Sequence, residues 1–224
     1  MRKPQPPTTI AELIERVDQI AGSTLGELAQ SYGFKTPDTL NREKGWIGQL
    51  IEYVLGASAA SRPEPDFPTL GIELKTLPIS YAGKPLETTY VSITPLTNLH
   101  GATWHNSVVK KKLSHVLWLP ILSERDIAPT DRVIGTGFLW QPSVLQEKQL
   151  RNDWEELTEM IALGQIEKIN GHFGQVLQIR PKAANSKALT NAIGPDGKEI
   201  TTLPRGYYLK TQFTQQILAE QFGT

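Results

Sequence analysis

The segment over residues 70–77, LGIELKTL, constrains the fold of this chain more than any other. Apolar side chains recur at every second position through Ile72 and Leu74, which is the period of a β-strand. In such a strand Glu73 and Lys75 project from the opposite face, with their backbone attachment points roughly 7 Å apart. The segment therefore predicts a strand that packs one face into a core and presents a carboxylate and an ammonium on the other.

Two carboxylates and one ammonium in this region suit metal-assisted phosphodiester cleavage. Mg²⁺ takes few carboxylates together with waters and substrate phosphate, so Asp66 and Glu73 are candidate ligands. A divalent cation polarises a phosphoryl oxygen and lowers the pKa of a bound water. Lys75 is a candidate to orient or deprotonate the attacking water, or to stabilise negative charge on the phosphate. The same pattern also occurs on the solvated face of an amphipathic sheet, so it does not select the chemistry alone.

Composition favours a soluble globular protein. Of the 224 residues, 39% are hydrophobic and 21% charged, which is ordinary for a chain that buries one sizeable core or two lobes. With no cysteine, disulfides and thiolate metal sites are excluded. The sequence contains no apolar run near the roughly 18 to 20 residues of a membrane span, and its first residues, MRKPQPP, lack the apolar core of a signal peptide. We therefore expect a cytoplasmic protein.

The charge balance gives no global signature of a nucleic-acid-binding protein, because 23 basic residues match 23 acidic ones. DNA binding would need a local patch. One candidate is the run of lysines over residues 110–112, and a second is the later set Arg180, Lys182, Lys187, Arg205 and Lys210. A solvated helix face is the simpler interpretation of either cluster, and composition alone favours it.

Periodicity along the chain predicts a mixed α/β fold. Helical spacing of apolar residues covers residues 9–21, 24–32, 46–56, 106–113, 143–163 and 212–222. Strand-like composition covers residues 88–93, 116–121, 133–140 and 175–180, and we expect the first three of these to flank the strand at 70–77. Residues 194–197, GPDG, predict a turn.

Seven ordered blocks of the sequence resemble the MutH family, the strand-nicking endonucleases of methyl-directed mismatch repair. The blocks are GWIG at 45–48, LGASA at 55–59, PEPDF at 63–67, LGIELKT at 70–76, PLETT at 85–89, QIRPKAAN at 178–185 and LPRGYYLK at 203–210. The resemblance extends essentially from residue 10 to residue 222. It implies a restriction-endonuclease-like fold, with a central sheet flanked by helices. The single domain over residues 1–224 would comprise a catalytic lobe (1–140) and a DNA-recognition lobe (141–224) around a DNA-binding cleft.

The resemblance also assigns roles to individual residues. The catalytic group would be Glu52, Asp66, Glu73, Lys75 and Lys112, with Asp66, Glu73 and Glu52 as Mg²⁺ ligands. The DNA-binding group would be Lys44, Tyr90, Arg180, Pro181, Lys182 and Tyr208. Among these, Tyr208 matches the tyrosine that distinguishes unmethylated from methylated adenine, whereas Tyr90 stands where the family has phenylalanine.

The implied activity is Mg²⁺-dependent nicking of the unmethylated strand at hemimethylated GATC sites. The implied partners are double-stranded DNA, the activator MutL and, indirectly, MutS, and we expect a monomer. Two alternatives remain open from the residues. One is a stand-alone type II restriction endonuclease that cuts both strands, and the other is a non-catalytic DNA-binding module whose acidic residues are structural.

Overall fold

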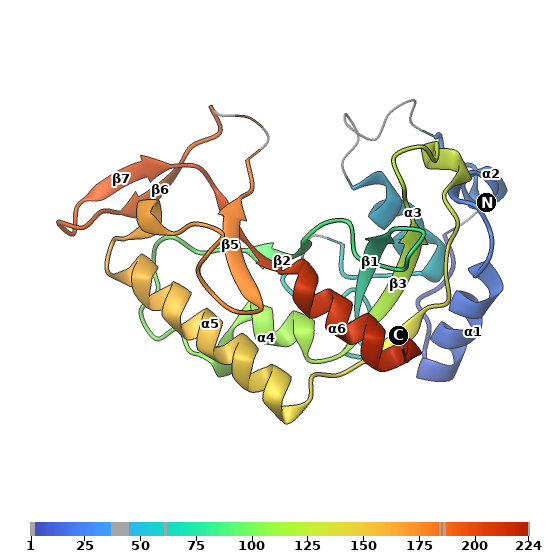
Figure 1. Cartoon of the computed structure of the whole chain (residues 1–224), viewed down its shortest axis with the longest axis horizontal. Helices are drawn as coiled ribbons and strands as arrows, with labels where there is room; N and C mark the ends of the chain where they lie inside the picture. Colours follow the sequence, from blue (N-terminus) through green and yellow to red (C-terminus); the bar gives the residue numbers. More distant parts are fainter. Residues whose placement is uncertain (1–2, 37–44, 61, 184, 186, 224) are drawn as a thin grey trace. The chain divides into compact units, whose positions relative to one another are not determined.

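The computed structural model describes residues 3–36, 45–60, 62–183, 185 and 187–223 (Figure 1). The helices are α1 (Ile10–Ile20), α2 (Leu25–Tyr32), α3 (Trp46–Leu55), α4 (Val108–Leu113), α5 (Val144–Ala162) and α6 (Thr211–Phe222). The strands are β1 (Glu73–Ile79), β2 (Thr89–Ile93), β3 (Val116–Leu122), β4 (Phe138–Trp140), β5 (Leu177–Pro181), β6 (Thr190–Ile193), β7 (Glu199–Thr202) and β8 (Arg205–Leu209). The predicted mixed α/β class is confirmed. None of the described helices is both long and apolar enough to cross a membrane.

The chain forms two compact units, and each is built from segments that are separated in sequence. The first unit comprises Met1–Glu87 and Ser114–Gln141, and the second comprises Thr88–Leu113 and Pro142–Thr224. The stretch Thr88–Leu113 therefore belongs with the C-terminal residues, although the sequence places it before the expected lobe boundary at residue 140. The reason is strand pairing, because β2 is hydrogen-bonded to β8.

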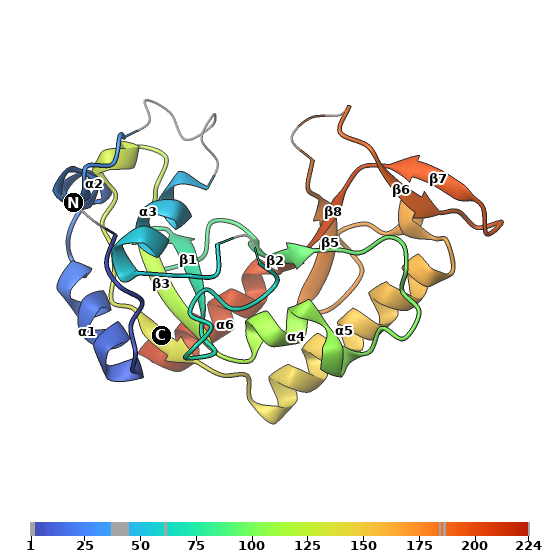
Figure 2. The ribbon, with the colours of Figure 1, turned by 180° about the vertical axis from the view of Figure 1, so that it is seen from behind.

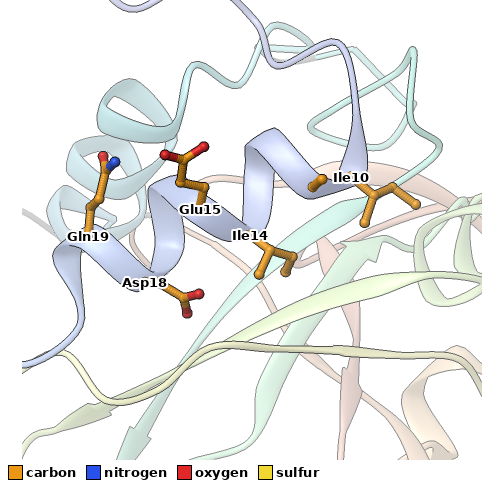
Figure 3. A pocket seen from close by; sticks show the side chains of 6 residues that line it. Ile10, Ile14, Glu15, Asp18 and Gln19 are labelled. Carbon is orange, nitrogen blue, oxygen red and sulfur yellow. The ribbon is translucent and has the colours of Figure 1, made fainter.

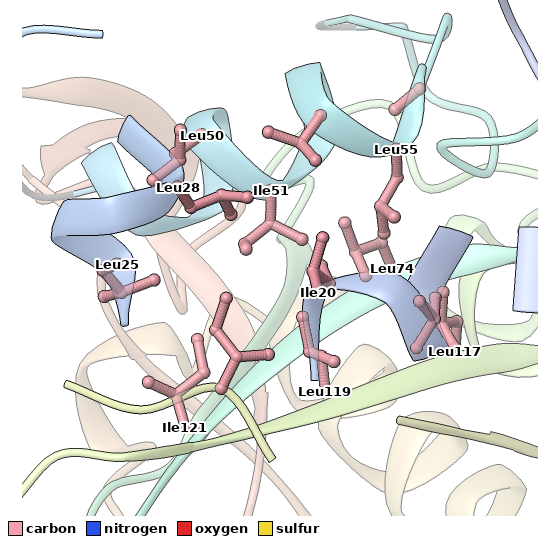
Figure 4. Close-up of a cluster of buried hydrophobic side chains, with 14 of the residues drawn as sticks. Ile20, Leu25, Leu28, Leu50, Ile51, Leu55, Leu74, Leu117, Leu119 and Ile121 are labelled. Atoms are coloured by element: carbon pink, nitrogen blue, oxygen red, sulfur yellow. The ribbon is translucent and has the colours of Figure 1, made fainter. Parts of the chain in front are cut away.

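The first unit is a three-stranded sheet in the order β1-β3-β4, covered by the N-terminal helices. β1 and β3 are parallel, with Glu73 opposite Val116, and β4 is antiparallel to β3. Buried side chains of α1, α2 and α3 pack against Leu74 and the β3 side chains in one apolar cluster (Figure 4). This packing confirms that one face of the predicted strand lies in a core.

Local sequence signals place the helix ends. The Thr9 hydroxyl accepts a hydrogen bond from the Glu12 N–H at the start of α1, and Thr24 and Glu27 form a reciprocal capping box at the start of α2. α3 ends at Gly56, whose φ of 82° lies in the left-handed region that glycine adopts at no steric cost.

The strand predicted over residues 133–140 is shorter in the structure. Only Phe138–Trp140 forms a strand, while Ile134 makes an isolated bridge to Ile121. Gly135 and Gly137 interrupt the segment, and glycine inside a strand weakens it because it has no side chain to pack.

The second unit contains a three-stranded antiparallel sheet in the order β2-β8-β5 and the separate hairpin β6-β7. The expectation that residues 88–93 flank the strand at 70–77 is therefore wrong, because β2 pairs with β8 instead. The predicted turn at 194–197 is confirmed and closes the β6-β7 hairpin through a hydrogen bond from the Gly194 N–H to the Lys198 carbonyl. Helix α5 covers one face of the β2-β8-β5 sheet (Figures 1 and 2).

Candidate functional site

Glu73 and Lys75 form a buried ion pair on one face of β1. The Lys75 Nζ donates to Glu73 Oε1 at 2.6 Å, and their side chains are 10% and 2% exposed, respectively. The strand period predicts this shared face, since the two residues are separated by Leu74. Removing two opposite charges from water is costly unless they remain paired, so each group requires the other in the free protein.

Asp66 is held directly against the same strand. Its Oδ2 accepts a 2.9 Å hydrogen bond from the N–H of Leu74, which belongs to the peptide group that joins Glu73 to Leu74. Its backbone carbonyl accepts from the N–H of Ser58 at 2.9 Å, which fixes the other side of the loop. With 8% exposure, Asp66 is nearly as buried as its neighbours. The structure therefore brings Asp66, Glu73 and Lys75 together, as the sequence pattern requires for joint chemistry.

A tight turn accounts for the approach of Asp66 to β1. Phe67 and Ile72 form an antiparallel bridge, and the chain reverses between them at Gly71, which has a φ of 67°. Because a left-handed conformation is strained for residues with a Cβ, glycine suits this reversal. The spacing between Asp66 and Glu73 in the sequence is thus the length of one short loop.

Glu52 belongs to α3 and is half-buried. α3 leads into a segment that is bonded to the Asp66 loop. The Glu52 carbonyl accepts a hydrogen bond from the N–H of Ala57 at 2.8 Å, and the next residue, Ser58, donates its N–H to the Asp66 carbonyl. Among the described residues, no group of three or more Asp, Glu, His or Cys side chains is arranged to hold a metal ion. The structure therefore does not gather Glu52 with the two other carboxylates into such a group.

The donor set at β1 nevertheless fits Mg²⁺ rather than a metal held in an all-protein cage. Asp66 accepts a hydrogen bond from the N–H of Leu74, the residue that follows Glu73, so both side chains offer carboxylate oxygens at the start of β1. Mg²⁺ is usually bound through one or two carboxylates, with waters and substrate phosphates completing its coordination. Two carboxylates beside a lysine are therefore a suitable ligand set, with Lys75 as the group that balances their charge.

The run of lysines at 110–112 is divided between different roles. The Lys110 Nζ lies 2.9 Å from Glu147 Oε1 on α5, and the Trp104 indole N–H donates to the same oxygen at 3.2 Å. The hydrogen bond from Lys110 is the main cause of a lowered pKa at Glu147. Glu147 thus partly balances the positive charge of Lys110, and this ion pair attaches α4 to α5. Lys112 is half-buried near the end of α4, in the second unit.

A face of the β2-β8-β5 sheet collects four of the residues that the sequence assigns to DNA binding. Tyr90 and Tyr208 are opposite one another in register, with ring centroids 5.4 Å apart in an edge-on arrangement. The Arg180 guanidinium carbon lies 5.9 Å from the centre of the Tyr208 ring, and the Lys182 Nζ lies 4.2 Å from the centre of the Tyr90 ring. We call these four residues the aromatic-cation face.

The cations of this face are accessible to a ligand. Arg180 and Lys182 are exposed, and Arg180 donates to the Thr88 hydroxyl at 2.9 Å. Pro181 lies between them, opposite Arg205 at the end of β5, and is also exposed. Lys44, the remaining predicted DNA contact, lies outside the described residues.

Gly206 leaves the space that the two tyrosine rings occupy. A Cβ at this position would lie 3.0 Å from Tyr90 Cε2, 3.2 Å from Tyr208 Cε2 and 3.2 Å from the Ser92 carbonyl oxygen. We expect Gly206→Ala to displace both rings and to lower the free energy of unfolding by about 1 to 3 kcal/mol, the usual cost of overpacking. Urea unfolding and the near-ultraviolet circular dichroism of the tyrosines would measure this change. An unaltered spectrum and stability would show that the rings accommodate the methyl group.

Asp153 anchors the start of β5, and sequence reasoning missed this role. This carboxylate is 3% exposed and accepts three backbone hydrogen bonds, from the N–H groups of Gln175 at 2.8 Å, Val176 at 2.7 Å and Leu177 at 2.8 Å. One signal in the sequence could have indicated it, because Asp153 lies directly before Trp154 within the stripe of residues that α5 buries. A charged residue inside an apolar stripe indicates a buried polar partner.

Two further hydrogen bonds tie this sheet to its surroundings. The Lys210 Nζ donates to the Gly174 carbonyl at 2.6 Å, and the hydroxyls of Tyr207 and Thr158 are 3.1 Å apart. Burial raises the pKa of Tyr207 to about 12. Tyr207 therefore keeps its proton at neutral pH and links β8 to α5.

The depression along α1 is a separate surface feature. Side chains of α1 alone line it, among them Ile10, Ile14, Glu15 and Asp18 (Figure 3). None of the predicted catalytic or DNA-binding residues contributes to this depression. We therefore place the candidate chemistry at β1 and the candidate recognition surface at the aromatic-cation face.

Comparison with known proteins gives one consistent result. The family described as "DNA mismatch repair enzyme MutH" matches residues 55–153. The protein named "DNA mismatch repair protein MutH" from Shewanella woodyi is 54% identical over 223 residues, which cover 100% of this chain and 96% of the relative. Proteins of the same name from Vibrio cholerae and Serratia proteamaculans are each 55% identical, covering 97% and 98% of this chain and 98% and 96% of the relatives, respectively.

Proposed function

Because the chain belongs to the MutH family, with its restriction-endonuclease-like fold, we propose that it is a DNA endonuclease of mismatch repair. In its finer form, the proposal is that the enzyme nicks the unmethylated strand at hemimethylated GATC sites by Mg²⁺-dependent hydrolysis. The observation that carries the proposal is the joint placement of Asp66, Glu73 and Lys75 at the start of β1. A non-catalytic DNA-binding module would have no need of a buried carboxylate and lysine beside a second carboxylate.

The proposed chemistry assigns one task to each residue. Asp66 and Glu73 would hold the metal, which when bound would polarise the phosphate and lower the pKa of a bound water. Lys75 would donate hydrogen bonds to the attacking water or to a phosphate oxygen, where a compact cation stabilises developing negative charge. Its present bond to Glu73 keeps it oriented at this position. Glu52 and Lys112 remain further catalytic candidates by resemblance.

The proposed recognition of GATC uses the aromatic-cation face. Arg180 and Lys182 carry the donors that match the O6 and N7 acceptors of guanine. Tyr208 would contact the adenine edge, where an added N6 methyl group changes both shape and hydrogen bonding. Tyr90, Pro181 and Lys44 would complete the DNA contacts. Support comes from the convergence of Tyr90, Arg180, Lys182 and Tyr208 on one sheet face.

Resemblance to the family extends the proposal to the repair pathway. We propose that the protein acts as a cytoplasmic monomer, that MutL activates it, and that MutS acts indirectly by finding the mismatch. The family name of the relatives supports a place in DNA mismatch repair.

Cleavage of plasmids that carry a single GATC site tests the proposal. The site is unmethylated, hemimethylated or fully methylated, and each reaction is run with Mg²⁺ or with chelator, and with or without MutL. We expect nicks confined to unmethylated strands, enhanced by MutL and absent with chelator. Double-strand cutting that is indifferent to MutL would instead indicate a restriction endonuclease. Binding without cleavage under every condition would indicate the DNA-binding module.

We expect Tyr208→Phe to weaken the discrimination between unmethylated and methylated adenine while nicking of unmethylated DNA persists. The phenol hydroxyl is lost, but the ring that meets Tyr90 and Arg180 is kept. The measurement is the ratio of nicking rates on hemimethylated and fully methylated duplexes. Tyr81→Phe is a matched control, because Tyr81 is 65% exposed on a turn of the first unit. Unchanged discrimination in Tyr208→Phe would argue against the assigned role.

A further inference from the structure

Gln178 lies on the same side of the sheet as the aromatic-cation face. Along β5, the side chains of Leu177 and Ile179 are 0% and 2% exposed and share the face covered by α5. Since alternate strand residues point to opposite faces, Gln178 projects to the other side, together with Arg180. Its cross-strand partner on β8 is Tyr208.

Three strands therefore form a single row of side chains on this face. Gln178 pairs in register with Tyr208, and Tyr208 pairs in register with Tyr90 on β2. Directly opposed side chains on one sheet face are near neighbours. A ligand edge placed at the Tyr208 ring is consequently within reach of the side chain at position 178.

The Gln178 amide is polar, largely buried and without a hydrogen-bond partner in the described part of the chain. The residue is 7% exposed, yet its side chain makes no hydrogen bond with any described residue. Neither of its polar atoms is fully sealed from the surface. Its Oε1 adjoins Gly171, where an added Cβ would approach it to 3.2 Å.

An amide in this state favours binding of a complementary ligand. Most largely buried polar groups in folded proteins are hydrogen-bonded, so an amide without a protein partner is available to a ligand. Core packing does not require an amide at position 178, because Leu177 and Ile179 supply the side of β5 that faces α5. Because neither polar atom is sealed from the surface, a partner that arrives with DNA can bond to the amide there.

We propose that Gln178 is a specificity-determining residue that reads the adenine of the bound site. The inference rests on the proposed recognition of GATC. Oε1 would accept a hydrogen bond from the adenine N6–H, and Nε2 would donate to adenine N7, which is the pairing that glutamine geometry favours in the major groove. Guanine presents two acceptors on this edge and mismatches the amide. A methyl group on adenine N6 would occupy the position of the donated hydrogen, so Gln178 would reinforce the selection of the unmethylated strand.

Base analogues combined with substitutions test the proposal. Duplexes carry adenine, 7-deazaadenine, which lacks the N7 acceptor, or purine, which lacks the N6 amino group, within one GATC site. For the wild type we expect nicking efficiency to fall roughly ten- to a hundredfold on either analogue. Gln178→Met should show a comparable loss on the natural site and little additional loss on the analogues. Gln175→Met is the matched control, because Gln175 is exposed before β5, and it should behave as the wild type.

Gln178→Glu provides a second variant with the same shape. The glutamate retains an acceptor for N6–H but has no donor for N7, so the variant should be sensitive to purine and insensitive to 7-deazaadenine. Thermal unfolding establishes that each variant is folded. Should Gln178→Met fail to fold, the analogue responses of Gln178→Glu decide the question.

The outcomes separate this inference from the proposed function. If the wild type cleaves GATC in preference to a scrambled site, and Gln178→Met matches it on all three duplexes, the role of Gln178 is overturned while the endonuclease proposal stands. A Gln178→Glu variant with wild-type sensitivity to 7-deazaadenine would also overturn it. A wild type without preference for GATC would overturn the proposed recognition itself.

Discussion

Glu73→Gln should lower the rate of DNA cleavage by at least about 10²- to 10³-fold, the scale of losing one electrostatic group at a reacting centre. The substitution keeps the volume of a side chain that is 1% exposed, but it removes the negative charge that pairs with Lys75. A neutral amide is also a poorer ligand for a hard divalent cation. DNA affinity should change little, since the aromatic-cation face is untouched.

Single-turnover nicking of a GATC duplex, with fluorescence anisotropy for binding, measures both quantities. Glu15→Gln serves as the control, because it makes the same chemical change at an exposed position on α1. Wild-type cleavage by Glu73→Gln would exclude Glu73 from the catalytic group. Reduced cleavage with an equal loss of DNA binding would instead indicate a general defect in folding.

A double substitution separates catalysis from the cost of a buried charge. Glu73→Gln leaves the Lys75 ammonium, whose side chain is 10% exposed, without its carboxylate partner. Breaking one side of a buried ion pair destabilises a protein by about 3 to 5 kcal/mol, whereas an apolar replacement of both partners is often neutral. Adding Lys75→Met should therefore restore part of the unfolding free energy but none of the cleavage.

Asp153→Ala should reduce the free energy of unfolding by roughly 3 to 5 kcal/mol, because three backbone N–H groups, two of them buried, would lose their acceptor. Each buried group left unsatisfied costs about 1 to 3 kcal/mol. Their bonds to the Asp153 carboxylate are all 2.8 Å or shorter. Asp153→Asn should cost less, since its amide retains one acceptor oxygen. The start of β5 would loosen in both variants, and Arg180 and Lys182 would lose their defined positions.

Urea unfolding gives the stability, and the ratio of nicking rates at GATC and a single-base variant gives the effect on recognition. Glu156→Ala is the matched control on the exposed side of α5. We expect Asp153→Asn to keep its fold at low temperature and to lose discrimination there. Retained discrimination in a folded Asp153→Asn would mean that β5 keeps its register without this anchor.

Local periodicity was sufficient to predict most elements. The helix expected over residues 9–21 is Ile10–Ile20, and the one expected over 143–163 is Val144–Ala162. Threonine and serine at the helix starts and glycine at the ends are short-range signals, so they act within one turn of the chain. The shared face of Glu73 and Lys75 follows from the same kind of local rule, because strand geometry alone puts alternate residues together.

Long-range pairing was beyond such rules. Strand composition identified residues 88–93, but nothing in it indicated that β2 would pair with β8, more than a hundred residues later. As a consequence, Thr88–Leu113 belongs to the second unit, where the ring of Tyr90 contacts the ring of Tyr208. Arg180 and Lys182 were candidates from their chemistry, yet their positions over the two rings depend on that strand order.

The sequence by itself determined the residue types of the candidate chemistry and the strand that carries Glu73 and Lys75. Its blocks that resemble one family supplied the predicted roles of the remaining site residues. Only the tertiary structure decided that Asp66 bonds to the Leu74 N–H, that Asp153 supports β5 and that Gln178 lies opposite Tyr208 without a hydrogen bond from its amide to any described residue. The physical reason is that hydrophobic periodicity depends on neighbours along the chain. Hydrogen-bond satisfaction depends on whichever groups folding brings together.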